Sequence, residues 1–313
     1  MPNTPSFSPE SVARITEPTE LPACVMTINA NDPSGACGLT ADIITIASVG
    51  GHPLPVAAGA YIRDTGQCFD HCALDDEIVV EQARAVLEDL PVQVLKLGFV
   101  GTPENISAVA ELTSDYPDLP VVAYMPNLSW WQDDRIDQYL DAFRELLLPQ
   151  TTVLVGNHTT LWRWLLPDWD RDTPPGPRDI AAAAAQVGVP YILVTGIPLP
   201  EQFVENVLAT PESVLCSSRV ELFDATFTGA GDTLSAALCA LLASGCDLSE
   251  AFAEALGYLD GCLESGFRPG MGHVVPDRMF WAEPEDDEPP PAAEPEDTPS
   301  AHEFGLPPHD TQH

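Results

Sequence analysis

Basic residues are scarce in this sequence, and lysine is almost absent. Twelve Lys and Arg residues stand against 48 Asp and Glu residues, and Lys96 is the single lysine in a chain of formal net charge -36. A field of that sign repels phosphate backbones and anionic lipid surfaces. The composition therefore argues against nucleic acid and membrane partners.

Long apolar runs and a regular cysteine framework are also absent. No stretch of 18 apolar residues occurs, which argues against a membrane-spanning helix. The first 21 residues have neither a basic start nor an apolar core, so we expect a disordered leader rather than a secretory signal. Eight cysteines without repeated spacing indicate reduced thiols in the cytoplasm. A metal held by Cys68, His71 and Cys72 is the weaker alternative, because no second ligand pair follows.

A change of composition at residue 283 predicts a domain boundary. Residues 283–313 contain ten acidic residues, eight prolines and no lysine or arginine. Such a segment cannot bury enough apolar surface to offset the entropy that ordering would cost. We therefore expect a leader over 1–21, one folded domain over 22–282, and an acidic, proline-rich disordered tail.

Within the folded part, short apolar runs alternate with amphipathic stretches. Strand patterns at 23–28, 55–62 and 92–100 are separated by helix patterns at 38–50 and 75–90, and the alternation continues toward the C-terminus. This α/β order predicts a mostly parallel central sheet with helices on both faces. Residues 203–223 predict a strand pair outside that rhythm. Ligands of such sheets bind at the carboxyl ends of the strands, so we expect the site there.

A glycine-rich turn before a late helix is the most informative segment. Residues 224–232 read DATFTGAGD. Two glycines let the backbone turn into a helix whose free N–H groups and dipole form an anion site. Asp232, in the first helical turn, could take the proton of a hydroxyl held beside those amides, as phosphoryl transfer requires. The alternative is an ordinary loop-to-helix junction with an acid placed for the dipole.

The run TGAGD, late in an α/β chain, resembles the signature of ribokinase-like kinases. The resemblance implies that Asp232 is the catalytic base. It also implies that Gly229, Ala230 and Gly231 form the anion hole, with Thr228 on the nucleotide side.

An N-terminal motif narrows the resemblance. Residues 27–42, TINANDPSGACGLTAD, resemble the AGxDPSGGAGxxAD motif of hydroxymethylpyrimidine kinases. The resemblance implies that Asp42 hydrogen-bonds the pyrimidine of the substrate and that Ala30 lies beside it. The strand at 95–100 resembles the family's KIGM strand and puts Phe99 at a substrate-stacking position, although core packing is an equally good interpretation. Further matches extend the resemblance to about residues 22–280.

Arg63 replaces the glutamine with which the family recognises the ring. A guanidinium offers only donors, so Arg63 favours a substrate with more acceptors, a phosphate or a carboxylate. The alternative is a surface arginine paired with Asp64.

The family's metal side is also altered. The NxxE motif survives as Asn157 to Thr160 without its acid, Tyr124 stands where an aspartate is expected, and no lysine lies near Thr195. Asn157 and Thr195 remain as candidate nucleotide-binding residues, and the metal ligands are unassigned.

The resemblance implies transfer of phosphate from ATP, with Mg²⁺, to the CH₂OH group of 4-amino-5-hydroxymethyl-2-methylpyrimidine and to its monophosphate, in thiamine biosynthesis. Two alternatives stay open: a pyridoxal-type kinase, and a ligand-binding paralogue with weakened catalysis. The expected partners are a heterocyclic alcohol and ATP, and a homodimer is left open.

Overall fold

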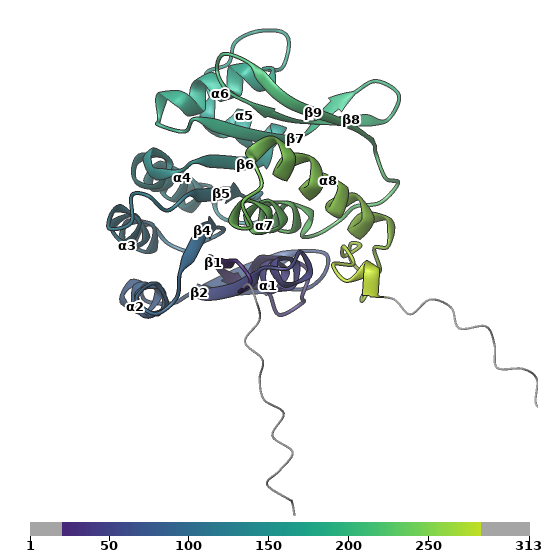
Figure 1. Cartoon of the computed structure of the whole chain (residues 1–313). Helices are drawn as coiled ribbons and strands as arrows, with labels where there is room; N and C mark the ends of the chain where they lie inside the picture. Colours follow the sequence, from purple (N-terminus) through teal and green to yellow (C-terminus); the bar gives the residue numbers. More distant parts are fainter. Residues whose placement is uncertain (1–20, 283–313) are drawn as a thin grey trace, which may run out of the picture. The chain divides into compact units, whose positions relative to one another are not determined.

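A nine-stranded sheet crosses the molecule in the computed structural model, which describes residues 21–282 (Figure 1). The strand order is β3-β2-β1-β4-β5-β6-β7-β8-β9. Apart from Leu21, the predicted leader and the predicted tail lie outside the described residues, so both stay predictions.

The strands have the following bounds: β1 Cys24–Asn31, β2 His52–Arg63, β3 Cys68–Ala73, β4 Val92–Leu97, β5 Val121–Met125, β6 Val153–Asn157, β7 Tyr191–Leu199, β8 Phe203–Ala209 and β9 Val214–Glu221. The α-helices are α1 Gly38–Ser48, α2 Asp76–Leu87, α3 Pro103–Ser114, α4 Asp133–Ala142, α5 His158–Leu165, α6 Pro177–Gln186, α7 Ala230–Ala243 and α8 Leu248–Glu264. A π-helical turn (Phe143–Leu147) and two 3₁₀ turns (Leu148–Gln150, Phe280–Ala282) complete the elements.

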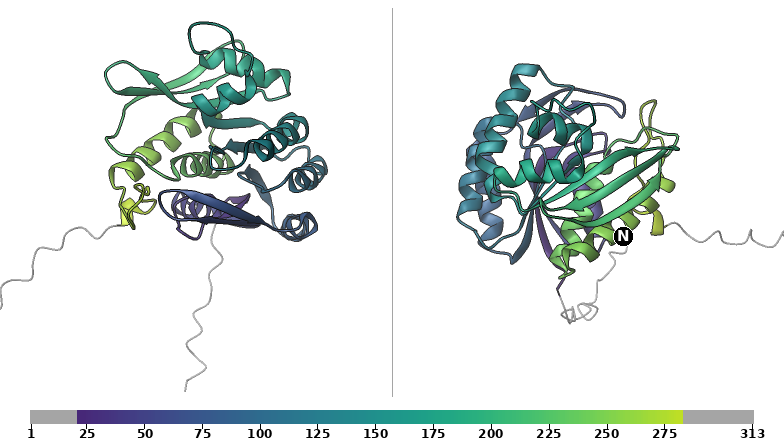
Figure 2. Two further views of the ribbon diagram at one scale, coloured as in Figure 1. Left: turned by 180° about the vertical axis from the view of Figure 1, so that it is seen from behind. Right: turned by 90° about the horizontal axis from the view of Figure 1, so that it is seen from above.

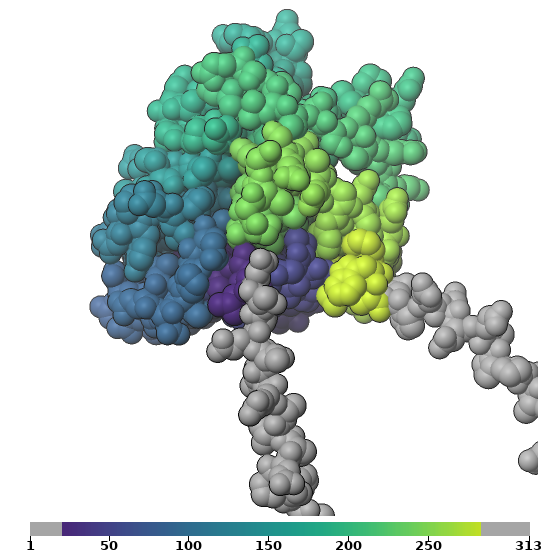
Figure 3. All heavy atoms as spheres, in the orientation of Figure 1, coloured from purple at the N-terminus to yellow at the C-terminus, as the bar shows by residue number. Residues whose placement is uncertain are grey.

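The centre of the sheet is parallel, as the alternating sequence pattern predicts. Strands β2, β1, β4, β5, β6 and β7 pair in parallel. The edges are antiparallel, with β3 on β2 at one side and the predicted strand pair, β8 and β9, at the other. In Figure 3, β8 and β9 protrude beyond the body of the domain.

Helices cover both faces of the sheet (Figure 2). Helices α2 to α6 pack on one face and α1, α7 and α8 on the other, each face with its own buried apolar cluster. Strand β1 shows why, because its first seven residues are all buried. A parallel strand covered on both faces is buried continuously rather than on alternate residues, and in β1 the two buried polar residues, Thr27 and Asn29, make hydrogen bonds. The predicted fold class is confirmed.

Two elements, β3 and α5, have no counterpart in the predicted pattern.

The candidate metal ligands of the sequence lie on strand β3. Alternation along this strand puts Cys68 and Cys72 on the face opposite His71. The His71 ring packs instead against Phe99 and Trp131, at centroid distances of 5.1 and 4.8 Å. Residues 21–282 contain no group of three His, Cys, Asp or Glu placed to hold a metal ion, and the eight cysteines are free.

The described helices include none that combines the length and the apolar character needed to cross a bilayer.

Candidate active site

The motifs picked out from the sequence meet at the carboxyl ends of the central strands. The turn over residues 32–37 follows β1, Tyr124 lies near the end of β5, and Asn157 ends β6. The glycine turn leads into α7, which packs across β1, β4, β5 and β6. Four separate parts of the chain therefore share one cleft, where parallel sheets bind ligands.

The glycine turn is packed so closely that side chains are excluded. Gly229 caps α7 with a φ of +92°, and a Cβ there would overlap Ala36 O and approach Arg278 Nη2 to 2.6 Å. A Cβ at Gly231 would overlap the Oη atom of Tyr124. Glycine is thus required twice, at Gly229 for both backbone conformation and space, and at Gly231 for space.

Asp232 lies in the first turn of α7 and is 7% exposed. Its Oδ1 accepts a hydrogen bond from Asn29 Nδ2 (3.2 Å) and lies 3.7 Å from Lys96 Nζ. Burial raises the pKa of Asp232, the Lys96 ammonium opposes that rise, and the Asp42 carboxylate adds to it. A carboxylate held in this way, at a cavity wall, suits a proton acceptor.

Beneath Asp232 lies a buried ion pair between Lys96 and Asp42. Lys96 Nζ donates to Asp42 Oδ1 at 2.6 Å, and both side chains are fully buried. Asp42 Oδ2 also accepts hydrogen bonds from Thr27 Oγ1 (2.6 Å) and Asn29 Nδ2 (3.0 Å). Burial alone would lower the pKa of Lys96, but Asp42 and Asp232 raise it overall, so the ammonium stays charged.

This placement does not fit the expected role of Asp42. Its carboxylate accepts three hydrogen bonds from protein donors, is fully buried, and lines none of the cavities described below. A hydrogen bond from Asp42 to a substrate ring is therefore not what the geometry supports. The side chain instead holds Lys96 under Asp232.

A cavity of about 580 Å³ opens on one side of the glycine turn. Arg63 lies in its wall with its side chain 10% exposed, 3.7 Å from Asp32 Oδ2, and Nη1 donates to Cys37 Sγ at 2.7 Å. Asp64 supplies only its backbone carbonyl to Arg63, so a surface ion pair between the two side chains is not present. Protein partners therefore engage Nε and Nη1 of Arg63, and within residues 21–282 its Nη2 is the guanidinium nitrogen left for a ligand in this cavity. The further lining residues include Tyr61, Trp130, Thr228, Gly229, Asp232 and His273.

Phe99 and Ala30 do not reach this cavity. Both are 1% exposed. Phe99 stacks behind Tyr61 at 5.5 Å between ring centroids and 20° between planes, so Tyr61 presents the aromatic surface. The expected stacking of Phe99 on a substrate is thus replaced by core packing. Tyr61 was missed by the sequence reasoning, although it lies two residues before Arg63 on β2.

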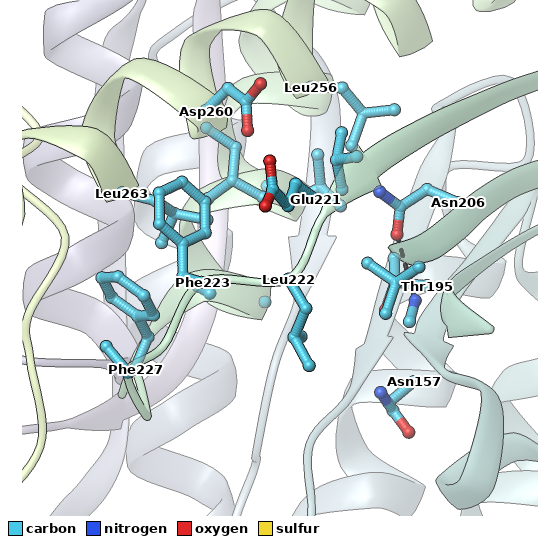
Figure 4. Close-up of a pocket in the computed structure, with 18 residues that line it drawn as sticks. Asn157, Thr195, Asn206, Glu221, Leu222, Phe223, Phe227, Leu256, Asp260 and Leu263 are labelled. Carbon is cyan, nitrogen blue, oxygen red and sulfur yellow. Dashed lines mark hydrogen bonds between the residues drawn. The ribbon is translucent and has the colours of Figure 1, made fainter. Parts of the chain in front are cut away.

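A second cavity, of about 220 Å³, lies on the other side of the turn (Figure 4). Asn157 and Thr195 line it, as do Asn206, whose Oδ1 accepts from Gly196 N (3.0 Å), and apolar side chains of β8–β9 and α8. Ala230 and Gly231 form its wall, whereas Gly229 and Asp232 face the first cavity. The glycine turn is therefore a partition between two cavities. Thr228 lies on the first side, not on the second as expected.

A third cavity, of about 720 Å³, joins the other two. It shares Tyr124 with the first and Asn157 with the second. Asn157 also caps α5, because its Oδ1 accepts from Thr159 N at 3.0 Å. Within the described part of the chain this junction has no cluster of acidic metal ligands.

Arg278, which no motif indicated, ties the site together. It is 4% exposed, and it donates to the carbonyls of Gly35 and Ala36 and, at 2.9 Å, to Thr233 Oγ1. One guanidinium thus joins the N-terminal turn to the first turn of α7. Its position after the last long helix carries no local signal that sequence reasoning could have used.

A parallel α/β sheet with a cleft at its carboxyl ends, divided by a glycine turn, defines the ribokinase-like fold. Residues 32–277 match the family model described as phosphomethylpyrimidine kinase. The chain belongs to this family.

A curated relative agrees with that membership, and two solved structures agree with the fold. The hydroxymethylpyrimidine/phosphomethylpyrimidine kinase of Streptomyces coelicolor is 29% identical over 267 residues, covering 85% of this chain and 97% of the relative. The ADP complex of Bacillus subtilis pyridoxal kinase superposes with a TM-score of 0.74 at 22% identity, over 84% of this chain and all of that one. The phosphomethylpyrimidine kinase of Clostridium difficile 630 gives a TM-score of 0.62 at 20% identity, over 76% and 99%.

Proposed function

We propose that the protein transfers the γ-phosphate of ATP to the hydroxymethyl group of 4-amino-5-hydroxymethyl-2-methylpyrimidine and to its monophosphate, a step of thiamine biosynthesis. Family membership supports this activity, and so does the name of the Streptomyces relative. The observation that carries the proposal is the position of the glycine turn between two cavities, with Asp232 on one side. Two substrates could thus meet across one anion site.

In this mechanism the heterocyclic alcohol lies in the cavity with Arg63 and Tyr61, and the nucleotide occupies the cavity with Asn157 and Thr195. The alcohol oxygen attacks the γ-phosphorus while Asp232 takes its proton. The bond between the γ-phosphorus and the bridging oxygen breaks, and its electron pair leaves with ADP. The amides of the turn and the α7 dipole stabilise the charge on the moving phosphoryl group.

Arg63 suits the proposed second substrate, because a guanidinium can bind two oxygens of a phosphate. Burial alone would lower the pKa of Arg63, but neighbouring groups, Asp32 among them, raise it overall, so it stays cationic in the cavity. That positive charge offsets part of the repulsion that a chain of net charge -36 exerts on anionic ligands.

Mg²⁺ enters this proposal with the phosphates of ATP. The described residues offer no cluster of acidic ligands near the turn, and Mg²⁺ retains several waters and binds substrate phosphates readily. When bound it would neutralise phosphate charge. The proton transfer and the stabilisation of phosphoryl charge described above are assigned to protein groups and not to the metal ion.

The test is ADP release by the purified chain with ATP and Mg²⁺, with hydroxymethylpyrimidine, its monophosphate and pyridoxal offered separately. We expect turnover with the two pyrimidines and its loss in Asp232→Asn, which keeps the size of the side chain. Turnover with pyridoxal alone would identify a pyridoxal-type substrate and refute the pyrimidine assignment. Binding of a pyrimidine without turnover would favour the non-catalytic paralogue.

A further inference from the structure

Tyr124 occupies the point where the cavities meet the glycine turn. It lies near the end of β5 and lines both the first cavity and the joining cavity. Its Oη atom is so close to Gly231 that a Cβ there would overlap it. The phenol therefore touches the backbone that we assign to the moving phosphoryl group.

The hydroxyl of Tyr124 has no hydrogen-bond partner among residues 21–282, although its ring is half-buried and lies 5.8 Å from Lys96 Nζ. A phenol held in this way, at a cavity wall and without a protein partner, has a donor to offer a ligand. Burial, and then the charge of Asp232, raise the pKa of Tyr124, so the proton stays on the phenol.

We propose that Tyr124 is a catalytic residue, whose hydroxyl donates a hydrogen bond to the γ-phosphoryl group of ATP bound at the turn. This inference rests on the proposed function and adds a donor that is itself uncharged. The Tyr124 proton is not transferred: the alcohol proton goes to Asp232, and the electron pair of the broken bond goes to ADP. The phenol stabilises negative charge that the phosphoryl oxygens carry in the transition state.

The first test is Tyr124→Phe, which removes only the hydroxyl. Loss of one donor to a charged transition state costs about tenfold to a hundredfold in kcat, and we expect a loss in that range. The matched control is Tyr191→Phe, at the start of β7 and so at the opposite end of the parallel strands. An unchanged or increased kcat in Tyr124→Phe would overturn the assignment.

A binding measurement separates this inference from the proposed function. Calorimetry would compare ADP with a non-hydrolysable ATP analogue on the wild-type chain and on Tyr124→Phe. We expect about a threefold to tenfold loss of affinity for the analogue and no change for ADP. Equal losses for both nucleotides, or none, would refute contact with the γ-phosphate. This comparison can be read even if no alcohol is phosphorylated, and failure to bind either nucleotide would refute both proposals.

Discussion

The region beneath the glycine turn and the junction of the cavities beside it are built in opposite ways. Beneath the turn, Asp42, Lys96 and Asp232 form a buried charged group, with Asn29 bonded to both carboxylates. At the junction of the cavities the two shared side chains, Tyr124 and Asn157, are uncharged, and the hydroxyl of Tyr124 has no partner within the described residues. One side is complete without a ligand, and the other is not.

This difference indicates which parts of the chemistry the protein fixes in advance. The proposed base and the amides of the turn are held by buried partners, and such preorganised groups cost no rearrangement during reaction. The junction of the cavities leaves room for the phosphates of the nucleotide and the Mg²⁺ that accompanies them. We infer that damage to the buried side affects folding and rate together, whereas changes on the open side affect nucleotide binding.

The largest expected effect comes from Lys96→Met, because it leaves Asp42 buried without its cation. Breaking a buried ion pair by removing one partner costs about 3–5 kcal/mol, and urea unfolding would measure it. The ammonium lowers the pKa of Asp232, so its loss raises that pKa further. The acid limb of kcat/KM should therefore move to higher pH, since the base is protonated sooner as the pH falls.

The double variant Lys96→Met with Asp42→Asn distinguishes charge from packing. Removing both charges spares the cost of an unpaired carboxylate, so we expect most of the stability to return. The acid limb should also move back toward that of the wild type, because the opposing influence of Asp42 on Asp232 is gone. A double variant as unstable as Lys96→Met would show that packing of the lysine chain, not the ion pair, matters.

Much of this site could be predicted from the sequence, but not the direction in which side chains point. The apolar alternation and the run from Thr228 to Asp232 were enough for the fold class and for the turn. Asp42 and Phe99 lie in recognisable motifs, yet the single lysine turns Asp42 inward and Tyr61 covers Phe99. Those outcomes depend on contacts between segments far apart in the chain, which spacing along the sequence does not show.

Arg278→Lys should have an intermediate effect on the buried side. A lysine keeps the charge but loses the planar fork that reaches Thr233 and two carbonyls of the 32–37 turn. We expect a loss of about 1–3 kcal/mol of stability from unsatisfied buried groups. The rate should also fall, since the turn after β1 and the start of α7 are no longer joined. Full activity at a reduced melting temperature would limit Arg278 to a structural role.

The smallest expected effect lies on the open side, at Asn157. Its Oδ1 caps α5, so Asn157→Ala should cost about 1 kcal/mol, whereas Asn157→Ser retains a capping oxygen and should cost less. The two variants separate the cap from the predicted contact with the nucleotide. If the amide also binds ATP, both variants raise the KM for ATP, although only the alanine variant loses stability. A normal KM for ATP in Asn157→Ser would leave Asn157 as a helix cap alone, and the nucleotide cavity would then rely on Thr195 and the backbone of the turn.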